Sequence, residues 1–414
     1  MFDAKILALA ADAEKELSPL FTAIDETALY NTEKVLSAFS KYRVSEGHFA
    51  GTTGYGYDDR GRDDLERIYA DVFGTEDALV RINFVNGTHA IGTALFGALE
   101  PGKKLVCATG MPYDTMIQVI GIDKPRFGSL AAWGITAEVV PMKGREPDIE
   151  AIKAACADEN VGAVLVQRSR GYADRISLSC DLIGKICEAV RSVNKKAFIV
   201  VDNCYGEFVE KTEPTQHGAD AIVGSLIKNP GGGLAPGGAY IAGSHDYIER
   251  CATRLTVAGI GRECGATFSV NRSLYQGFFM APHVTAQALK TAHFGAALME
   301  RLGFGVDPKP CDVRHDIIQT FAFGEAKPLL AFCKGIQAGA PVDSYVTPEP
   351  WDMPGYDCPI VMAAGAFIQG ASIELSCDAP MREPFTAYMQ GGLTYESGKL
   401  GILRAAELIV SEGK

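Results

Sequence analysis

The sequence predicts an α/β protein with a mainly parallel central sheet that is covered by helices on both faces. Between about residues 79 and 240, short apolar runs alternate with helical stretches, which is the order of a parallel sheet with crossover helices. Most of these runs are continuously apolar, as strands buried on both faces require. The chain has 414 residues, 47% of them hydrophobic, so it is long enough for a large core and two or three domains.

Seven runs rich in β-branched and apolar residues are the expected strands of this sheet. They are ALVRINF (78–84), KLVCAT (104–109), AEVVP (137–141), AVLVQ (163–167), AFIVVD (197–202), DAIVGS (220–225) and GGAYIA (237–242). Helices with one apolar face are expected between them, for example at residues 148–157 and 182–193. Ligands of such sheets bind at the carboxyl ends of the strands, so functional residues are expected directly after these runs.

The rest of the chain predicts a second, smaller domain and the helices that connect it. The predicted segments are a helical arm (1–45), a large α/β domain (46–265), a long helical connection (266–306) and a small α/β domain (307–414). Pro282 lies in the connection, where it is expected to start or kink a helix. In the small domain, strands are expected at 316–323, 359–367 and 371–377, and helices at 325–337 and 396–410.

Charge and cysteine content exclude several classes of function. The formal charge is 39 − 51 = −12, without a long basic run, so neither nucleic acid nor an anionic membrane surface is an expected partner. The 11 cysteines are dispersed, odd in number and never spaced as C-x-x-C, which argues against a disulfide framework. The N-terminal segment is acidic and lacks the features of a secretory signal. We therefore expect a cytoplasmic protein that binds a small molecule.

An acid and a lysine follow two of the expected strands. Asp202 ends the run AFIVVD, and Lys228 follows the run DAIVGSLI, before the glycine-rich segment NPGGGLAPGGAY. This layout suits pyridoxal phosphate, because a lysine carries that cofactor covalently and a carboxylate pairs with its ring nitrogen. The alternative is that Asp202 caps a turn and Lys228 is solvated, and the pair alone does not decide between them.

A possible phosphate site and an aromatic residue favour the first alternative. FVNGTHAIGTALFGAL places Gly87 and Thr88 between a strand and a helical run, where backbone amides and a hydroxyl would meet a phosphate. Tyr113 follows the run KLVCAT, where its ring could cover the cofactor ring. Each signal alone is ordinary turn or cap chemistry.

Together these segments resemble fold-type-I pyridoxal-phosphate enzymes. More narrowly, the chain resembles the methionine gamma-lyase-like family, also called aluminium-resistance proteins, which are related to the cystathionine lyases. The resemblance covers nearly the whole chain. Its blocks are HFAGTTGYGYDDRGRDDLE, NFVNGTHAI, MPYDTM, VQRSRGYADR, VVDNCYGEF, SLIKNPGGGLAPGGAYIAG and APMREPFTAYMQGGLTYE.

The resemblance implies a role for each residue of the expected cofactor site. It makes Lys228 the lysine that carries pyridoxal 5'-phosphate and Asp202 the partner of the ring nitrogen. It places Tyr113 over the ring, and in the predicted reaction Tyr113 is also the proton shuttle for the leaving sulfur. The phosphate contacts that it implies within the chain are Gly87, Thr88 and Ser225.

The resemblance also implies a homodimer with composite active sites, which could pair into a homotetramer. In the cystathionine-lyase relatives, a tyrosine and an arginine of the neighbouring subunit reach the phosphate. The similar positions here are Tyr57 and Arg60, in the segment GYGYDDRGRDD. Without the resemblance, this segment reads as a glycine-rich surface loop.

Two departures from the pattern concern the substrate and the phosphate. Those lyases bind the substrate carboxylate with an arginine where this chain has Gln390, and an amide lacks the charge of a guanidinium. We expect Arg382 or Arg168 to take that role, or the substrate to differ. Ile227 stands where the lyases usually have a hydroxyl on the phosphate, and Arg168 with Arg170 could compensate.

The predicted function is a pyridoxal-phosphate-dependent carbon–sulfur lyase that acts on a sulfur-containing amino acid. The alternatives are another enzyme with the same cofactor (an aminotransferase, racemase or aldol-type lyase), or a cofactor-binding stress protein with little catalysis. No metal site is predicted, because the histidines show no ligand-like spacing with acids or cysteines. Cys204 is expected to be a buried, inert thiol.

Overall fold

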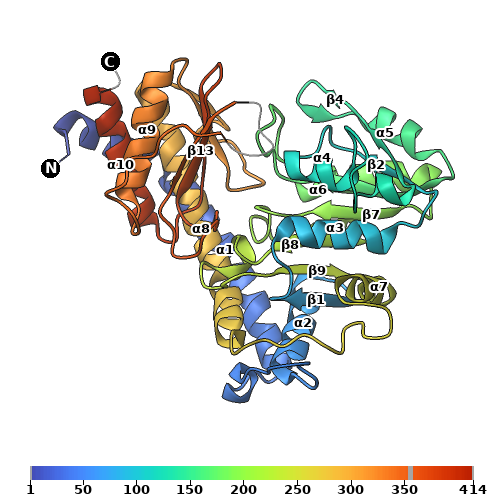
Figure 1. Ribbon diagram of the computed structural model, residues 1–414. Helices are drawn as coiled ribbons and strands as arrows, with labels where there is room; N and C mark the ends of the chain where they lie inside the picture. Colours follow the sequence, from blue (N-terminus) through green and yellow to red (C-terminus); the bar gives the residue numbers. More distant parts are fainter. Residues whose placement is uncertain (1, 353–357, 413–414) are drawn as a thin grey trace.

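The seven expected strands form one sheet. In the computed structural model, which describes residues 2–352 and 358–412, the strand order is β1-β9-β8-β7-β6-β2-β3. The strands are β1 (Asp77–Arg81), β2 (Lys104–Cys107), β3 (Thr136–Val139), β6 (Val161–Gln167), β7 (Phe198–Asp202), β8 (Ala221–Ser225) and β9 (Ala239–Gly243). Strand β9 runs antiparallel to both of its neighbours, and the other adjacent pairs are parallel. The sheet is therefore mainly parallel, as predicted (Figure 1).

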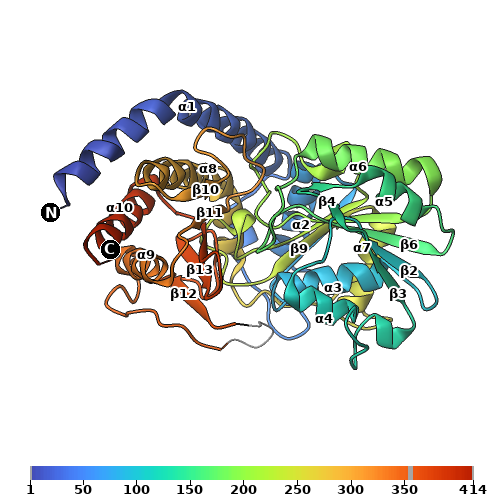
Figure 2. The ribbon, with the colours of Figure 1, turned by 90° about the horizontal axis from the view of Figure 1, so that it is seen from above.

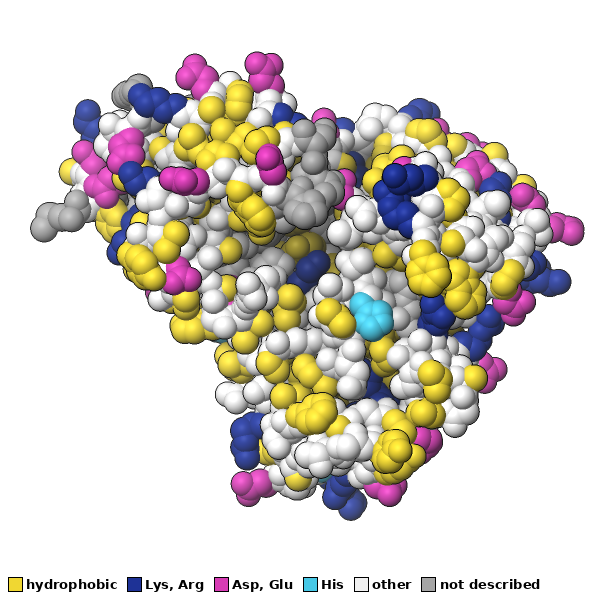
Figure 3. Space-filling view, viewed as in Figure 1, with side chains coloured by type: hydrophobic (Ala, Val, Ile, Leu, Met, Phe, Trp, Pro, Cys, Tyr) yellow, Lys and Arg dark blue, Asp and Glu magenta, His cyan; other side chains and the backbone are white. Residues whose placement is uncertain are grey.

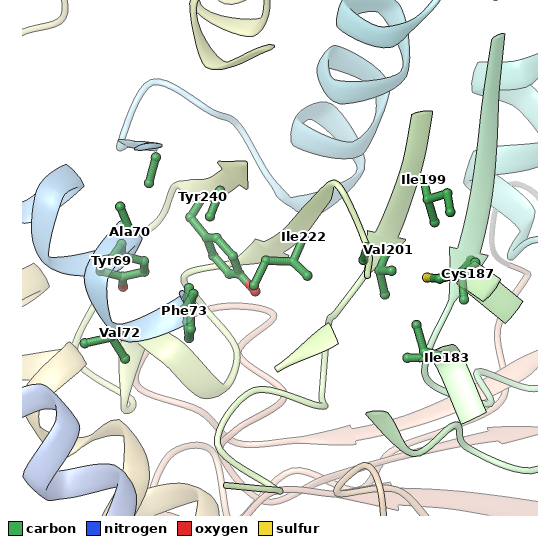
Figure 4. Close-up of a cluster of buried hydrophobic side chains, with 14 of the residues drawn as sticks. Tyr69, Ala70, Val72, Phe73, Ile183, Cys187, Ile199, Val201, Ile222 and Tyr240 are labelled. Atoms are coloured by element: carbon green, nitrogen blue, oxygen red, sulfur yellow. The ribbon is translucent and has the colours of Figure 1, made fainter. Parts of the chain in front are cut away.

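Helices cover both faces of this sheet because successive side chains of its strands point to opposite sides. Ile199 and Val201 of β7 belong to one buried cluster, and Val200 between them belongs to another. The first cluster is completed by α2 (Arg60–Phe73), α5 (Ile149–Cys156) and α6 (Cys180–Val193), and the second by α3 (Gly87–Ala98), α4 (Asp114–Ile120) and α7 (His245–Leu255). Figure 4 shows part of the first cluster, with α2 and α6 side chains against the strands.

Two long helices belong to both domains. Helix α8 (Asn271–Arg301) contributes its first half to the core of the large domain and its second half to that of the small domain. The predicted helical arm is α1 (Ala4–Lys41), and it too reaches from one core to the other (Figure 2). Pro282 lies inside α8, so it does not start a helix, and the kink expected there stays a prediction.

The small domain is built on an antiparallel sheet of five strands in the order β10-β11-β14-β13-β12. Helices α9 (Ala326–Gly339) and α10 (Tyr395–Glu412) pack in the same core and confirm the two predicted helices. The strands are β10 (Gly305–Asp307), β11 (Gln319–Ala322), β12 (Ile360–Ala364), β13 (Ser376–Pro380) and β14 (Thr386–Gln390).

One predicted strand of the small domain is misplaced, and some strands were missed. The prediction of a strand at 371–377 is wrong for most of its length, because β13 begins at Ser376. The buried Glu374 instead accepts hydrogen bonds from the backbone amides of Phe367 and Ile368 (2.9 and 3.0 Å), which holds this segment as a turn. Strands β10 and β14, and the hairpin of β4 (Met142–Lys143) and β5 (Glu146–Pro147), were not predicted; β10, β4 and β5 are too short for a periodic signal.

Among the described residues, no helix combines the length and apolar character needed to cross a bilayer.

A buried ion pair joins α2 to the end of β1. Arg81 Nε lies 2.6 Å from Glu66 Oε1, and the two side chains are 2% and 1% exposed. Arg262 pairs with the second oxygen of Glu66 at 2.9 Å. This cluster ties the segment after α7 to the sheet.

We expect Arg81→Met to lower the free energy of unfolding by about 3 kcal/mol, because it leaves Glu66 buried with one charged partner fewer. Urea unfolding followed by circular dichroism measures this. Arg67→Met is the matched control: Arg67 pairs with Asp64 but is 63% exposed, so its loss should be below about 1 kcal/mol. Equal losses in the two variants would contradict the assignment.

Candidate active site

The carboxyl edge of the large sheet borders a cavity between the two domains. Its volume is about 330 Å³, and residues of both domains line it. In the space-filling view, a hollow lies between the two domains with a basic side chain in it (Figure 3). The structure brings together six of the residues singled out from the sequence: Gly87, Thr88, Tyr113, Asp202, Ser225 and Lys228.

One end of the cavity can hold an anion. Helix α3 begins there at Gly87, and the side chain of its cap, Asn86, accepts the His89 N–H at 2.9 Å. The amides of Gly87 and Thr88 belong to the first turn, whose N–H groups have no acceptor within the helix. A Cβ built on Gly87 would lie 3.2 Å from the Cβ of Ser225, so glycine keeps this end open. The helix dipole also favours a negative charge at this position.

Asp202 is the last residue of β7 and is 5% exposed. Its Oδ1 accepts the backbone N–H of Cys204 at 3.1 Å. Burial raises the pKa of the Asp202 carboxyl, and the nearby Lys228 ammonium acts against this rise. A carboxylate in such surroundings is stabilised by a cationic partner.

Lys228 follows β8 by three residues and directly precedes the short helix η4 (Asn229–Gly231). Its Nζ lies 3.9 Å from the centre of the Tyr205 ring. Burial lowers the pKa of the Lys228 ammonium, but its acidic neighbours, Cys204 first and Asp202 among them, raise it more, so the net shift is upward. The amine is therefore protonated near neutral pH as long as these neighbours act on it.

Tyr205 is a residue that the sequence analysis missed. Its backbone has φ 72°, in the left-handed region that residues other than glycine rarely adopt. This turn carries its ring beneath Lys228, and its hydroxyl accepts a hydrogen bond from Ser372 of the small domain at 3.2 Å. No periodicity marks such a position, because it depends on one backbone conformation after β7.

Tyr113 is the N-cap of α4, and its hydroxyl shares a hydrogen bond of 3.0 Å with the Thr88 hydroxyl. Burial raises the pKa of Tyr113, so it keeps its proton near neutral pH. The contact joins the anion end of the cavity to its centre. Tyr113 can therefore donate a proton to a group bound between Thr88 and Lys228.

The prediction that Arg168 binds the substrate carboxylate is wrong. Arg168 is fully buried, and its guanidinium binds Glu210 Oε1 and Asn203 Oδ1, both at 2.7 Å. A second acid, Glu213, lies 3.3 Å away. The Arg168 guanidinium is thus held by carboxylates that are distant in the sequence. It does not line the cavity.

The other two arginines lie beside the cavity rather than in it. Arg170 binds Asp307, so it does not compensate for Ile227. Arg382 lines a neighbouring pocket, which shares Tyr113 and Tyr172 with the main cavity. Arg382 remains a predicted carboxylate ligand, next to the cavity.

Tyr57 and Arg60 do not reach the cavity of their own chain. Tyr57 is 57% exposed and stacks on Tyr55, with ring centres 5.5 Å apart. The Arg60 side chain is 65% exposed and pairs with Asp64 at 3.4 Å. Exposure leaves both side chains available to another subunit, and their assignment to a neighbouring site stays a prediction.

The small domain, the end of β6 and the loop after it supply lining residues that were not predicted. They are Gln167, Ser169, Gly171, Tyr172, Ile318, Asp378, Tyr388 and, as a polar side chain facing the cavity, Gln390. Cys204 also lines the cavity, and burial raises the pKa of its thiol, as expected for an unreactive cysteine. No sequence signal joins Tyr172 to Asp378, because their proximity depends on how the domains pack.

One cluster outside the cavity has the composition of a cation site. The ligand atoms of Asp77, His245 and Glu249 lie within 4.8 Å of one another. Arg262 pairs with both carboxylates, at 2.5 Å from Asp77 and 3.3 Å from Glu249. A guanidinium thus already supplies the positive charge there. The sequence missed this cluster because Asp77 is far from the other two residues along the chain.

Comparison with known proteins gives consistent similarities over almost the whole chain. The family model for methionine gamma-lyase matches residues 6–410. The uncharacterized protein YnbB of Bacillus subtilis (strain 168) is 46% identical over 405 residues, which are 97% of this chain and 96% of YnbB.

Solved structures of similar proteins have the same fold. A carbon–sulfur lyase involved in aluminium resistance from Clostridium novyi NT has a TM-score of 0.95 and 49% identity, covering 99% of this chain and 96% of that one. A candidate cystathionine beta-lyase involved in aluminium resistance from Clostridium acetobutylicum has a TM-score of 0.95 and 50% identity, covering 98% and 96%. The pyridoxal-5'-phosphate-dependent protein YhfS of Escherichia coli, at 19% identity and a TM-score of 0.63, covers 94% and 97% and shares the fold.

A buried acid lies directly behind the site. Glu207 is fully buried, and its Oε1 accepts the Tyr240 hydroxyl at 2.9 Å, whereas its Oε2 has no partner among the described residues. It lies against β8, where a Cβ on Gly224 would be 2.2 Å from Oε1. Burial raises the pKa of the Glu207 carboxyl to about 8.

This shift makes stability depend on pH. Between the ordinary carboxyl pKa and about 8, Glu207 is protonated in the folded protein and ionised in the unfolded chain, so a rise in pH destabilises the fold by up to about 1.4 kcal/mol per unit. We expect the stability of Glu207→Gln relative to the native protein to grow from about pH 5 to 8. Urea unfolding at several pH values measures this, with the exposed Glu159→Gln as control. A difference that is constant with pH would contradict the shift.

Proposed function

Since the chain belongs to the methionine gamma-lyase family, we propose that it is a pyridoxal-phosphate-dependent carbon–sulfur lyase that acts on a sulfur-containing amino acid. The observation that carries this proposal is the meeting of Lys228, Asp202 and the first turn of α3 in one cavity. The similarity to the Clostridium novyi carbon–sulfur lyase, at 49% identity, supports the reaction class.

The residues present fit pyridoxal phosphate from one end to the other. The open cradle at Gly87, the Thr88 amide and the Ser225 hydroxyl suit its phosphate. Asp202 would pair with the protonated ring nitrogen, the cationic partner that its buried carboxylate needs. Lys228 would hold the cofactor through its Nζ. When bound, the cofactor supplies an electron sink for negative charge on the α-carbon of the substrate.

Lys228 and Tyr113 would move the protons of the reaction. Once the substrate amine replaces it, the Lys228 amine would take the proton from the α-carbon as general base. A base must be neutral, and pairing of Asp202 with the ring nitrogen removes one of the charges that raise the pKa of Lys228. Tyr113, which keeps its proton, would donate it to the leaving sulfur. With one water, the products are a thiol, a 2-oxo acid and ammonia.

A second candidate function keeps the cofactor and changes the bond that breaks. It is favoured by one observation: at position 390 the cavity has a glutamine instead of an arginine that would bind the substrate carboxylate. A weakly held carboxylate leaves room for transamination, racemisation or aldol-type cleavage. Product analysis separates these, because they give a 2-oxo acid without thiol, a D-amino acid or an aldehyde.

The proposal includes a homodimer with composite sites. Tyr57 and Arg60 are exposed on the chain to which they belong, and apolar side chains such as Val257 (56% exposed) and Phe268 (61% exposed) are also open to solvent. An interface over these residues would bury them. It would bring Tyr57 and Arg60 to the phosphate end of a second subunit, as in the cystathionine-lyase relatives. A further pairing of two dimers into a homotetramer is compatible with this arrangement.

We expect Lys228→Ala to abolish the visible absorbance of bound cofactor and the release of thiol from sulfur-containing amino acids, because the amine that holds the cofactor is gone. Absorbance spectra after loading with pyridoxal phosphate and a thiol assay measure the two effects. Lys195→Ala, which removes an exposed lysine, is the control and should keep both properties. Retention of both by Lys228→Ala would refute the proposal.

If the active sites are composite, mixing two inactive variants should restore activity. In a heterodimer of Lys228→Ala and Arg60→Ala, one site has both an intact lysine and an intact arginine. Random mixing should give about a quarter of native activity, since about half of the dimers are heterodimers with one intact site each. Thiol release after mixing and reassociation measures this. No recovery above the separate variants would show that Arg60 serves its own chain.

A further inference from the structure

The wall that the small domain contributes to the cavity carries a carboxylate. Asp378 of β13 and Gln390 of β14 line the cavity from this side, beside Tyr172 from the loop after β6. None of the three belongs to the end that would hold the phosphate or the ring. They therefore border the space left for the substrate.

Hydrogen bonds fix the position of this carboxylate. The Tyr172 hydroxyl donates to Asp378 Oδ2 at 2.7 Å, and Gln390 Nε2 donates to the same oxygen at 3.3 Å. Gln390 Nε2 also reaches Ser376 Oγ at 3.3 Å. The rings of Tyr172 and Tyr388 pack with their centres 4.9 Å apart and hold the Tyr172 hydroxyl in place. The amide at position 390 is thus occupied with Asp378 and does not point at a substrate carboxylate.

Within the part of the chain that the structure describes, no cationic side chain balances the charge of Asp378. Among residues 2–352 and 358–412, no lysine, arginine or histidine makes an ion pair with it, and its two donors are neutral. Burial raises the pKa of the Asp378 carboxyl, while the bonds from Tyr172 and Gln390 lower it. A buried carboxylate without a cation is costly unless a ligand brings one.

Three of the arginines around the cavity are directed elsewhere. Arg168 binds Glu210, Arg170 binds Asp307, and Arg175 donates to the backbone carbonyls of Thr109 and Ser169. Of the cationic side chains in the described part of the chain, Lys228 alone lines the main cavity. On its substrate side, the main cavity is therefore lined by the acidic Asp378, whereas Arg382 lines the neighbouring pocket.

We propose that Asp378 determines specificity by binding a cationic amino group at the end of the substrate's side chain, so that the preferred substrates are amino-acid thioethers with an ammonium group beyond the sulfur. This inference rests on the proposed function and deepens it. Asp378 Oδ1, which accepts no hydrogen bond from the described residues, is the atom that would receive the ammonium. A neutral side chain of the same length would leave it unpaired, and an anionic one would be repelled.

Three cysteine thioethers of similar size test the proposal: S-(2-aminoethyl)-L-cysteine, S-propyl-L-cysteine and S-carboxymethyl-L-cysteine. With cofactor-loaded native protein, kcat/KM for the aminoethyl compound should exceed that for the propyl compound about tenfold or more. In Asp378→Asn, kcat/KM should fall at least about tenfold for the aminoethyl compound and stay within about twofold for the propyl compound. If no thiol is released, dissociation constants from calorimetry measure the same preference.

Matched variants separate a specific role from a structural one. Asp114→Asn removes another carboxylate that lines the cavity and should keep the native preference for the aminoethyl compound. Equal losses for the aminoethyl and propyl compounds in Asp378→Asn, or no preference in the native protein, would overturn the inference but leave the lyase function intact. Preferential binding of the aminoethyl compound without release of thiol from any of the three would instead overturn the proposed function.

Discussion

The parallel pairing of β6, β7 and β8 is the constraint on which the site depends. Gln167 lies opposite Asp202, and Asp202 lies opposite Val223, so the three strands end at nearly the same level. The chain must leave each strand at this edge, and the side chains that follow are therefore brought together. The antiparallel β9 does not disturb this arrangement, because it returns the chain to the opposite edge.

The charges at this edge divide into three groups with separate surroundings. Asp202 and Lys228 face the cavity near the cofactor end. Arg168 lies between Glu210 and Glu213, where its positive charge serves both carboxylates, and His315 also contacts Glu210. Asp378 lies on the opposite wall, and its donors among the described residues are neutral. A buried charge without a partner is costly, and a charge already paired within the protein is not available to a ligand.

Helices that belong to both cores fix the position of the two domains relative to each other. Residues of α8 pack against the sheet of the large domain in its first half and against the small domain in its second half. Helix α1 connects the same two cores. Arg170 adds an ion pair across the cleft to Asp307. The position of the Asp378 wall relative to Lys228 is therefore set by packing far from the cavity.

The sequence by itself determined the features that are local or periodic. Continuous apolar runs showed the strands of the large sheet, and the residues directly after them included Asp202, Lys228, Ser225 and the first turn of α3, which the structure gathers in one cavity. Tertiary structure alone decided which arginines are available to bind a substrate and which side chains line the substrate side of the cavity. The sequence suggested Arg168 as a substrate ligand, but in the structure Arg168 binds Glu210. Tyr172 and Asp378 are 206 positions apart in the chain and form a hydrogen bond. Strand periodicity is encoded within a few residues, whereas the balance of buried charges depends on groups that only packing brings together.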